Sequence, residues 1–247
     1  MSAARPGGDA ALPARGPGVD WRLYLVTDPH LGGGRGAVPD IVYEAVLGGV
    51  GVVQVRDKEC DDDEFATHAA AVAGAVARAC TETGRRDVPV FVNDRLDVAR
   101  ELGLHLHVGQ RDVPLARARA ALPVELMLGL SIESDGQLAA AVAGPGPAPD
   151  VIGVSPVWAT ATKTDTAAAL GPAGADRIAR AAHAHGVRAV GIGGVTPATV
   201  GQLAATDLDG VCVVSAIMAA ADPRAAAADL LARWEDGKSS SPGRPRA

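Results

Sequence analysis

Short apolar runs alternate along the chain with longer alanine-rich stretches. The runs are rich in β-branched residues and cover residues 22–27, 51–56, 88–93, 104–108, 126–131, 150–155, 188–192 and 210–215. Several are apolar at nearly every position, which is typical of parallel strands buried on both faces. The pattern therefore predicts eight parallel strands, each followed by a helical segment.

A strand–helix unit repeated eight times predicts an α/β protein with a single closed (β/α)8 TIM barrel. The chain has 247 residues, close to the length of about 250 residues that such barrels commonly have. The alternative is a doubly wound open sheet, which more often has about five or six strands. No G-x-G-x-x-G motif follows the first run, and this also favours the barrel.

Both ends of the chain lack hydrophobic periodicity. Residues 1–20 are rich in Ala, Gly and Pro, and residues 237–247 are similar. Both segments are predicted to be disordered tails that flank a catalytic barrel domain at residues 21–236.

Composition and charge limit which molecules the protein is expected to bind and where it is expected to be found. The formal net charge is -6 and the sequence has no basic block, which argues against nucleic acid. Cys60, Cys80 and Cys212 are widely spaced and match no metal-ligand pattern, so buried reduced thiols are expected. We find no apolar leader at the N-terminus and no apolar stretch long enough to span a membrane. A soluble, cytoplasmic protein is the expectation.

Polar residues follow the predicted strands where catalytic groups of such barrels lie. Gln54 and Arg56 are two residues apart, so on a strand they point to the same side. Lys58 adds a second cation, which favours an anion-binding site. The alternative is a structural ion pair of Arg56 with Asp57 or Glu59.

Two aspartates follow adjacent predicted strands, Asp94 after the third and Asp112 after the fourth. Neighbouring parallel strands lie about 4.8 Å apart, so the two carboxylates are placed to share one cation. Mg²⁺ binds through one or two carboxylates together with water and phosphate oxygens. The alternative is that each aspartate caps a helix, and Asp112 stands where it would cap one that has Pro114 in its first turn.

Two later segments are candidates for binding phosphate. The loop at 155–166 is rich in hydroxyl groups and contains Lys163, a combination that suits an oligophosphate. Residues 191–197 and 213–217 resemble the phosphate site that barrels build after strands 7 and 8, with backbone N–H groups at a helix start. Thr196 before Pro197 is expected to cap the first of these helices.

The first loop, residues 30–36, contains four glycines in seven residues. Glycine leaves the backbone many accessible conformations, and the loop follows the first strand on the catalytic side. A mobile lid is one hypothesis, and a plain connector is the other.

Six segments match one known family in order and spacing. Residues 52–58, 92–94, 107–112, 153–163, 191–197 and 209–217 resemble thiamine phosphate synthases, and the match covers roughly residues 22–235. Jointly the motifs are specific, whereas each one alone is weak.

The resemblance implies roles for individual residues. Asp94 and Asp112 look like ligands of one Mg²⁺ per subunit. Catalytic roles are implied for Arg56, Lys58, Ser131 and Lys163, which with Asn93 look like the pyrophosphate-binding set. The remaining residues implied in substrate binding are Tyr24 and Gln54 for the pyrimidine, Thr160, Thr162, Gly194 and Ser215 for the thiazole phosphate, and His107, Gly109, Gly193 and Val214.

The implied activity is that of a transferase with two small-molecule substrates. A pyrimidinylmethyl diphosphate would ionise, and a thiazole phosphate would capture the carbocation, giving thiamine monophosphate and pyrophosphate. No nucleophile–base pair is evident in the sequence, and this mechanism needs none. Nucleic acid and membranes are not expected as partners, and the resemblance leaves a homo-oligomer open.

The chain departs from the family pattern at four places. Asp57 stands where glutamate is common, Leu104-His105 where Asp-Gly is common, Glu133 where histidine is common, and Ala159 and Ala161 where prolines are common. None removes an implied phosphate or metal ligand. Two alternatives remain: a thiazole tautomerase-like enzyme, which needs one phosphate site and a proton-shuttling histidine, and a non-catalytic thiamine-phosphate-binding barrel.

Overall fold

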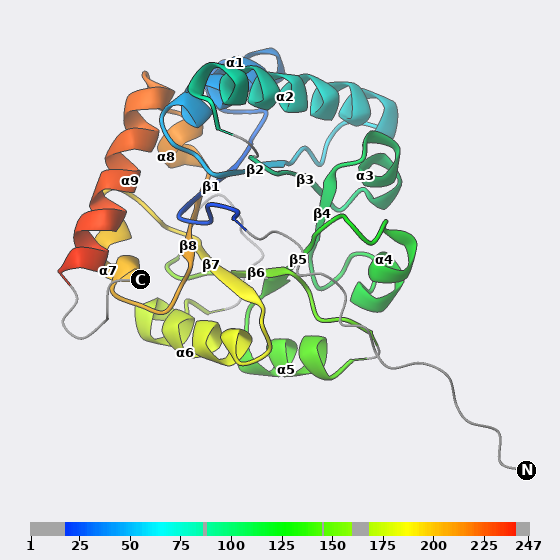
Figure 1. The fold of residues 1–247 in the computed structure, drawn as a ribbon, viewed down its shortest axis with the longest axis vertical. Coiled ribbons are helices and arrows are strands. Elements are labelled where there is room, and N and C mark those ends of the chain that lie inside the picture. Colours follow the sequence, from blue (N-terminus) through cyan, green and yellow to red (C-terminus); the bar gives the residue numbers. More distant parts are fainter. Residues whose placement is uncertain (1–17, 86–87, 145, 160–167, 241–247) are drawn as a thin grey trace, which may run out of the picture.

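Eight parallel strands close into a barrel in sequence order, and helices surround it (Figure 1). The computed structural model describes residues 18–85, 88–144, 146–159 and 168–240. The strands are β1 (Leu23–Val26), β2 (Val52–Val55), β3 (Val90–Asn93), β4 (His105–Val108), β5 (Leu128–Ile132), β6 (Val151–Val154), β7 (Arg188–Ile192) and β8 (Gly210–Val213). Because β1 pairs with β8 as well as with β2, the TIM-barrel prediction is confirmed and the open sheet is excluded.

The helices in the described part of the chain follow the strands in turn. They are the short 3-10 helix η1 (Arg35–Ala37) and the α-helices α1 (Val38–Leu47), α2 (Asp62–Thr83), α3 (Leu96–Leu102), α4 (Leu115–Ala121), α5 (Asp135–Ala143), α6 (Gly171–His183), α7 (Val200–Ala204), α8 (Ser215–Met218) and α9 (Pro223–Ser239). None of the described helices is both long and apolar enough to cross a membrane.

Alternation along each strand divides the core into two parts. On β1, Leu23 and Leu25 pack outward against the helices, whereas Tyr24 and Val26 point into the barrel. The rings of Trp21, Tyr24 and Phe91 lie 5.8–6.3 Å apart between centroids. Since Trp21 precedes β1, these rings fill the amino-terminal half of the barrel and leave the carboxyl-terminal half free for a site.

The last helix corrects the expected boundary at residue 236. Helix α9 continues to Ser239, because Lys238 is held at its end. The Lys238 ammonium donates to the carbonyl oxygens of Thr206 at 3.0 Å and Leu208 at 3.1 Å, and it lies 4.7 Å from the centre of the Trp234 ring. Residues 1–17 and 241–247 lie outside the described residues.

The expected capping role of Thr196 is wrong. Helix α7 begins at Val200, after Thr199. The Thr196 backbone N–H donates to the Thr199 hydroxyl at 2.9 Å, so the residues around Pro197 form a turn before the helix. Proline suits both a turn and the first turn of a helix, and the sequence pattern did not separate the two.

Candidate active site

A cavity of about 620 Å³ opens at the carboxyl ends of the strands. Every predicted site residue that the structure describes lines it, namely Tyr24, Gln54, Arg56, Lys58, Asn93, Asp94, His107, Gly109, Asp112, Ser131, Gly193, Gly194, Val214 and Ser215. Thr160, Thr162 and Lys163 lie outside the described residues. The closed barrel brings these side chains together because all eight parallel strands end at the same face.

The deep wall of the cavity carries one polar pair from neighbouring strands. The Gln54 amide nitrogen donates to the Tyr24 phenol oxygen at 2.9 Å, and both side chains are buried. Burial raises the pKa of Tyr24 well above its ordinary value, so the phenol keeps its proton. The pair leaves one O–H donor and one amide oxygen acceptor for a polar ring.

Arg56 and Lys58 line the rim after β2. The Arg56 guanidinium makes no ion pair or hydrogen bond with another described side chain, and the Arg56 backbone N–H donates to the Thr27 hydroxyl at 3.0 Å. Asp57 instead pairs with Arg35 at 2.7 Å, and Glu59 lies 3.3 Å from His30. The structural ion pair considered for Arg56 is therefore wrong, and within the described part of the chain its guanidinium lines the cavity without a carboxylate partner.

Asp94 follows β3 and Asp112 follows β4, and their carboxyl groups lie close enough for a protonated Asp94 to donate to Asp112. Burial, reinforced by the neighbouring Asp112, raises the pKa of Asp94 to about 6. Burial also pushes the pKa of Asp112 upward, but hydrogen bonds from Asp94 and the Gly109 N–H outweigh it and lower that pKa. Lys58 lies 3.2 Å from the Asp94 carboxylate and supplies the nearest cation.

The capping role considered for Asp112 is wrong. Helix α4 begins at Leu115 with Pro114 before it and no side-chain cap. The Asp112 carboxylate accepts from the Gly109 N–H at 2.7 Å, which holds it toward Asp94. Asp94 itself has a backbone φ of 65°, a left-handed conformation that aspartate tolerates better than most residues.

The donor set of this carboxylate pair fits Mg²⁺. Two neighbouring carboxylates suffice for an ion that keeps several waters and takes further oxygens from a phosphate. The described residues contain no group of three or more histidine, cysteine or acidic side chains placed to hold a metal. Sites of the zinc type, which are commonly closed by protein ligands, therefore have no counterpart in the described part of the chain.

His107 and Ser131 form a hydrogen-bonded pair that the sequence did not reveal. The His107 Nε2 lies 3.0 Å from the Ser131 hydroxyl. Glycines on the next two strands make room for the ring, since a Cβ at Gly129 would lie 2.4 Å from His107 Nδ1. The two side chains are 24 residues apart, so only the pairing of β4 with β5 brings them together.

The opposite side of the cavity is built from glycine backbone. Gly193 and Gly194 have φ angles of 102° and 68°. The loop after β6 lies against them: the Trp158 N–H donates to the Gly193 carbonyl at 3.0 Å, and a Cβ at Gly194 would lie 2.7 Å from the Cβ of Trp158. Ser215 opens the four-residue helix α8 beside them.

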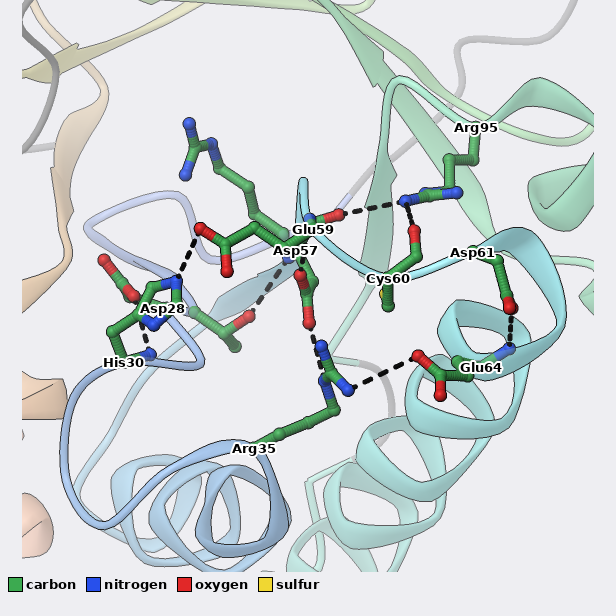
Figure 2. A network of polar contacts seen from close by, with 11 residues as sticks. Asp28, His30, Arg35, Asp57, Glu59, Cys60, Asp61, Glu64 and Arg95 are labelled. Atoms are coloured by element: carbon green, nitrogen blue, oxygen red, sulfur yellow. Dashed lines mark hydrogen bonds and ion pairs between the residues drawn. The ribbon is translucent and has the colours of Figure 1, made fainter.

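The glycine-rich loop at 30–36 does not line the cavity in this conformation. Gly32, Gly33 and Gly34 all have positive φ angles, and a Cβ at Gly32 would lie 2.4 Å from the Met218 carbonyl oxygen. The loop contains Arg35, whose contact with Asp57 is drawn in Figure 2. The proposed lid stays a prediction.

A family model described as "Thiamine monophosphate synthase" matches residues 23–217. The chain belongs to the thiamine monophosphate synthase family. The resemblance seen in the six motifs is thereby confirmed.

Individual relatives support the same family. The thiamine-phosphate synthase of Laribacter hongkongensis is 41% identical over 216 residues, which cover 87% of this chain and 95% of that protein. The thiamine biosynthesis multifunctional protein ThiED of Corynebacterium efficiens is 49% identical over 89% of this chain. The chain spans only 29% of that longer protein. A solved structure of thiamine phosphate pyrophosphorylase from Pyrococcus furiosus superposes with a TM-score of 0.73 at 26% identity, covering 89% of this chain and 98% of that one.

Several lining residues of this family member were missed by the sequence analysis. They are Thr27, Gln110, Arg111, Glu133, Gln137 and Thr196. Arg111 and Gln110 stand inside a recognised motif and could have been included on that ground. Gln137 lies on helix α5, where its side-chain oxygen accepts from the Glu133 N–H at 2.6 Å, and no local signal marks it.

Proposed function

We propose that this chain condenses 4-amino-2-methyl-5-(diphosphooxymethyl)pyrimidine with 4-methyl-5-(2-phosphooxyethyl)thiazole to give thiamine monophosphate and pyrophosphate. The observation that carries the proposal is the rim of β2, β3 and β4. There Arg56, which has no carboxylate partner among the described residues, stands beside Lys58 and the Asp94–Asp112 pair in one cavity. The names of the relatives agree with this reaction.

The diphosphate would lie against Arg56 and Lys58. Both residues follow the carboxyl end of a buried strand, which brings their cations to the cavity before the bond breaks. Negative charge grows on the diphosphate as the carbon–oxygen bond ionises, and fixed cations stabilise that growing charge without reorganisation. The electron pair of the broken bond leaves with the pyrophosphate.

The pyrimidine would lie on the deep wall. Tyr24 offers a phenol proton and Gln54 an amide oxygen, which suit the ring nitrogens and the exocyclic amino group of an aminopyrimidine. The apolar and aromatic residues beneath them exclude water from the methylene carbon. A shielded carbocation survives long enough to be captured by the thiazole instead of water.

Asp94 and Asp112 would hold Mg²⁺ through their paired carboxylates. When bound, the ion would add positive charge at the diphosphate oxygens. The new carbon–nitrogen bond forms from the thiazole nitrogen lone pair, so no proton has to leave the reacting atoms. An enzyme base is therefore not required, and His107 with Ser131 serves as a polar wall of the site.

The thiazole phosphate would lie between Gly193, Gly194 and Ser215. Backbone N–H groups and one hydroxyl bind a phosphate whose charge does not change during the reaction. This side should contribute binding and orientation more than acceleration.

A thiazole tautomerase-like activity is the second candidate, and His107 is the observation that favours it. Its imidazole lies in the cavity and could move a proton. That function leaves Arg56, Lys58 and the aspartate pair without a task, so we rank it below the synthase. A non-catalytic thiamine-phosphate-binding barrel leaves the same residues unexplained.

The test is a coupled assay with both substrates and Mg²⁺. The proposal expects thiamine monophosphate and pyrophosphate in equal amounts, with neither formed when one substrate is omitted. EDTA should stop turnover. Isomerisation of a thiazole precursor without pyrophosphate release would support the tautomerase instead, and binding of thiamine phosphate without any product would support the non-catalytic barrel.

A further inference from the structure

Asp57 is a carboxylate placed in sequence between the two cations of the diphosphate site. Side chains alternate at the end of β2, so Arg56 and Lys58 line the cavity. Asp57 turns the other way, and its side chain is 0% exposed. A buried carboxylate requires polar partners. The partners of Asp57 show what keeps its side chain turned away from the cavity.

The main partner of the Asp57 carboxylate is Arg35. Its Nε donates to Asp57 Oδ2 at 2.7 Å, and its other nitrogen lies 3.6 Å from Glu64 on helix α2. The second Asp57 oxygen accepts from the Glu59 N–H at 3.0 Å. Figure 2 shows Arg35 reaching from the first loop toward both Asp57 and Glu64.

A second arginine fixes the backbone of the same loop. Arg95 follows the third strand and donates to the carbonyls of Asp57 at 3.3 Å and Cys60 at 2.6 Å. Its guanidinium also lies 4.6 Å from the centre of the Phe65 ring. Arg95 holds the main chain whatever the Asp57 side chain does, so the Arg35 contact is separable from it.

The charges give the Arg35 contact a consequence for the site. Without Arg35, the Asp57 carboxylate would be buried without a cation and would gain by turning toward Arg56. A carboxylate there would neutralise the Arg56 guanidinium and repel a diphosphate. In the structure Arg35 holds Asp57, and Arg56 has no carboxylate partner among the described residues.

We propose that Arg35 is a positioning residue that sequesters the Asp57 carboxylate beneath the β2–α2 loop and so keeps the Arg56 guanidinium available to the diphosphate. The inference rests on the proposed function, because the diphosphate is the anion concerned. Arg35 does not line the cavity, so it acts through Asp57.

The experiment measures the affinity of the full chain for inorganic pyrophosphate with Mg²⁺ by calorimetry. Arg35→Gln should bind about tenfold more weakly, the scale of one charge-assisted contact. Adding Asp57→Asn should restore affinity to within about threefold of the unmodified protein, because no carboxylate is left to compete. Adding Glu64→Gln instead should restore nothing, although both double variants carry the same net charge.

This pattern separates charge sequestration from two simpler accounts. A purely mechanical role for the ion pair leaves Arg35→Gln/Asp57→Asn as weak as the single variant. A general loss of positive potential lets Glu64→Gln rescue as well as Asp57→Asn. Either outcome overturns the proposal. Arg177→Gln, which breaks the exposed pair with Asp135 at 2.8 Å, is the matched control and should leave affinity unchanged.

Two further results of the binding experiment also have a fixed interpretation. If Arg35→Gln does not fold, Asp57→Asn alone must bind pyrophosphate at least as tightly as the unmodified protein, and weaker binding overturns the proposal. If the unmodified protein binds no pyrophosphate, the diphosphate site of the proposed function falls and the role of Arg35 falls with it. Normal binding in the unmodified protein with no loss in Arg35→Gln overturns only the role of Arg35.

Discussion

The two sides of the cavity are suited to anions by different means. The side at β2, β3 and β4 presents charged side chains, with Arg56 and Lys58 beside Asp94 and Asp112. The side at β7 and β8 presents glycine backbone and the Ser215 hydroxyl, and no described lining residue from those two strands or the loops after them is a cation. The charged side suits a group whose charge grows during reaction, and the backbone side suits a group whose charge stays constant.

The contrast extends to what holds each side in place. The charged side is held by ion pairs that cross from loop to loop, such as Arg35 to Asp57. The backbone side is held by close approach, since Trp158 packs where a Cβ at Gly194 would stand. Substitutions should therefore act through charge on one side and through shape on the other.

The largest effect is expected at Asp94. Asp94→Asn keeps a side chain that tolerates the φ of 65° and removes the carboxylate, so kcat should fall more than about a hundredfold with little change in stability. Steady-state kinetics and urea unfolding measure the two quantities. Asp97→Asn, on the exposed face of α3, is the control. Equal loss in both variants would remove the metal role from Asp94.

Arg56 comes next. Arg56→Gln should lower kcat about a hundredfold and change KM less, because the cation acts on charge that develops in the transition state. Electron-withdrawing substituents on the pyrimidine should also slow the reaction steeply, since they destabilise the carbocation. A flat substituent series measured in single turnovers would rule out ionisation.

His105 should make the free energy of unfolding depend on pH in the acid range. Burial lowers the pKa of His105 from 6.5 to about 4, and its Nδ1 accepts from the Met127 N–H at 3.0 Å. As the pH falls, the imidazole of His105 is protonated in the unfolded chain before it is protonated in the folded one. The free energy of unfolding therefore keeps its full contribution from His105 above pH 6.5 and declines toward pH 4. The expected loss between pH 7 and pH 5 is roughly 2 kcal/mol.

His105→Asn should flatten this decline, because its side chain keeps an acceptor for Met127 but does not titrate. Urea unfolding at pH 7, 6 and 5 measures the slope, with the exposed His185→Asn as control. An unchanged slope in His105→Asn would assign the acid sensitivity to other groups.

The smallest of these effects is expected on the backbone side. Gly194→Ala places a Cβ 2.7 Å from Trp158 at a φ of 68°, so the loop must shift. We expect about a tenfold rise in KM for thiazole phosphate, with kcat less affected and a stability loss of about 1 kcal/mol. A fall in kcat as deep as that of Arg56→Gln would abolish the distinction between the two sides.

The strands were predictable because parallel strands buried on both faces require apolar residues at nearly every position. All eight runs became strands, with ends shifted by up to two residues. The polar residues at their carboxyl ends were predictable as a set, because barrel closure gathers those ends. The boundary of the barrel domain was set too early, at residue 236, because the contacts of Lys238 with Thr206 and Leu208 come from distant residues.

Partners of individual side chains were harder to predict. Asp112 and Thr196 both had the sequence of a helix cap, and each is engaged by another backbone or side-chain group instead. Arg35 is 22 residues from Asp57, and nothing in the local pattern marks it. Contacts of this kind depend on which loops the barrel brings together, and the periodicity of a single chain does not contain that information.

The division of labour between the two sides is tested most directly by single-turnover rates measured against thiazole phosphate concentration. Lys58→Gln and Ser215→Ala should be compared side by side with the unmodified protein. The account predicts that Lys58→Gln lowers the limiting rate without moving the half-saturating concentration, and that Ser215→Ala raises that concentration without lowering the limiting rate. Movement of the same parameter in both variants would contradict it.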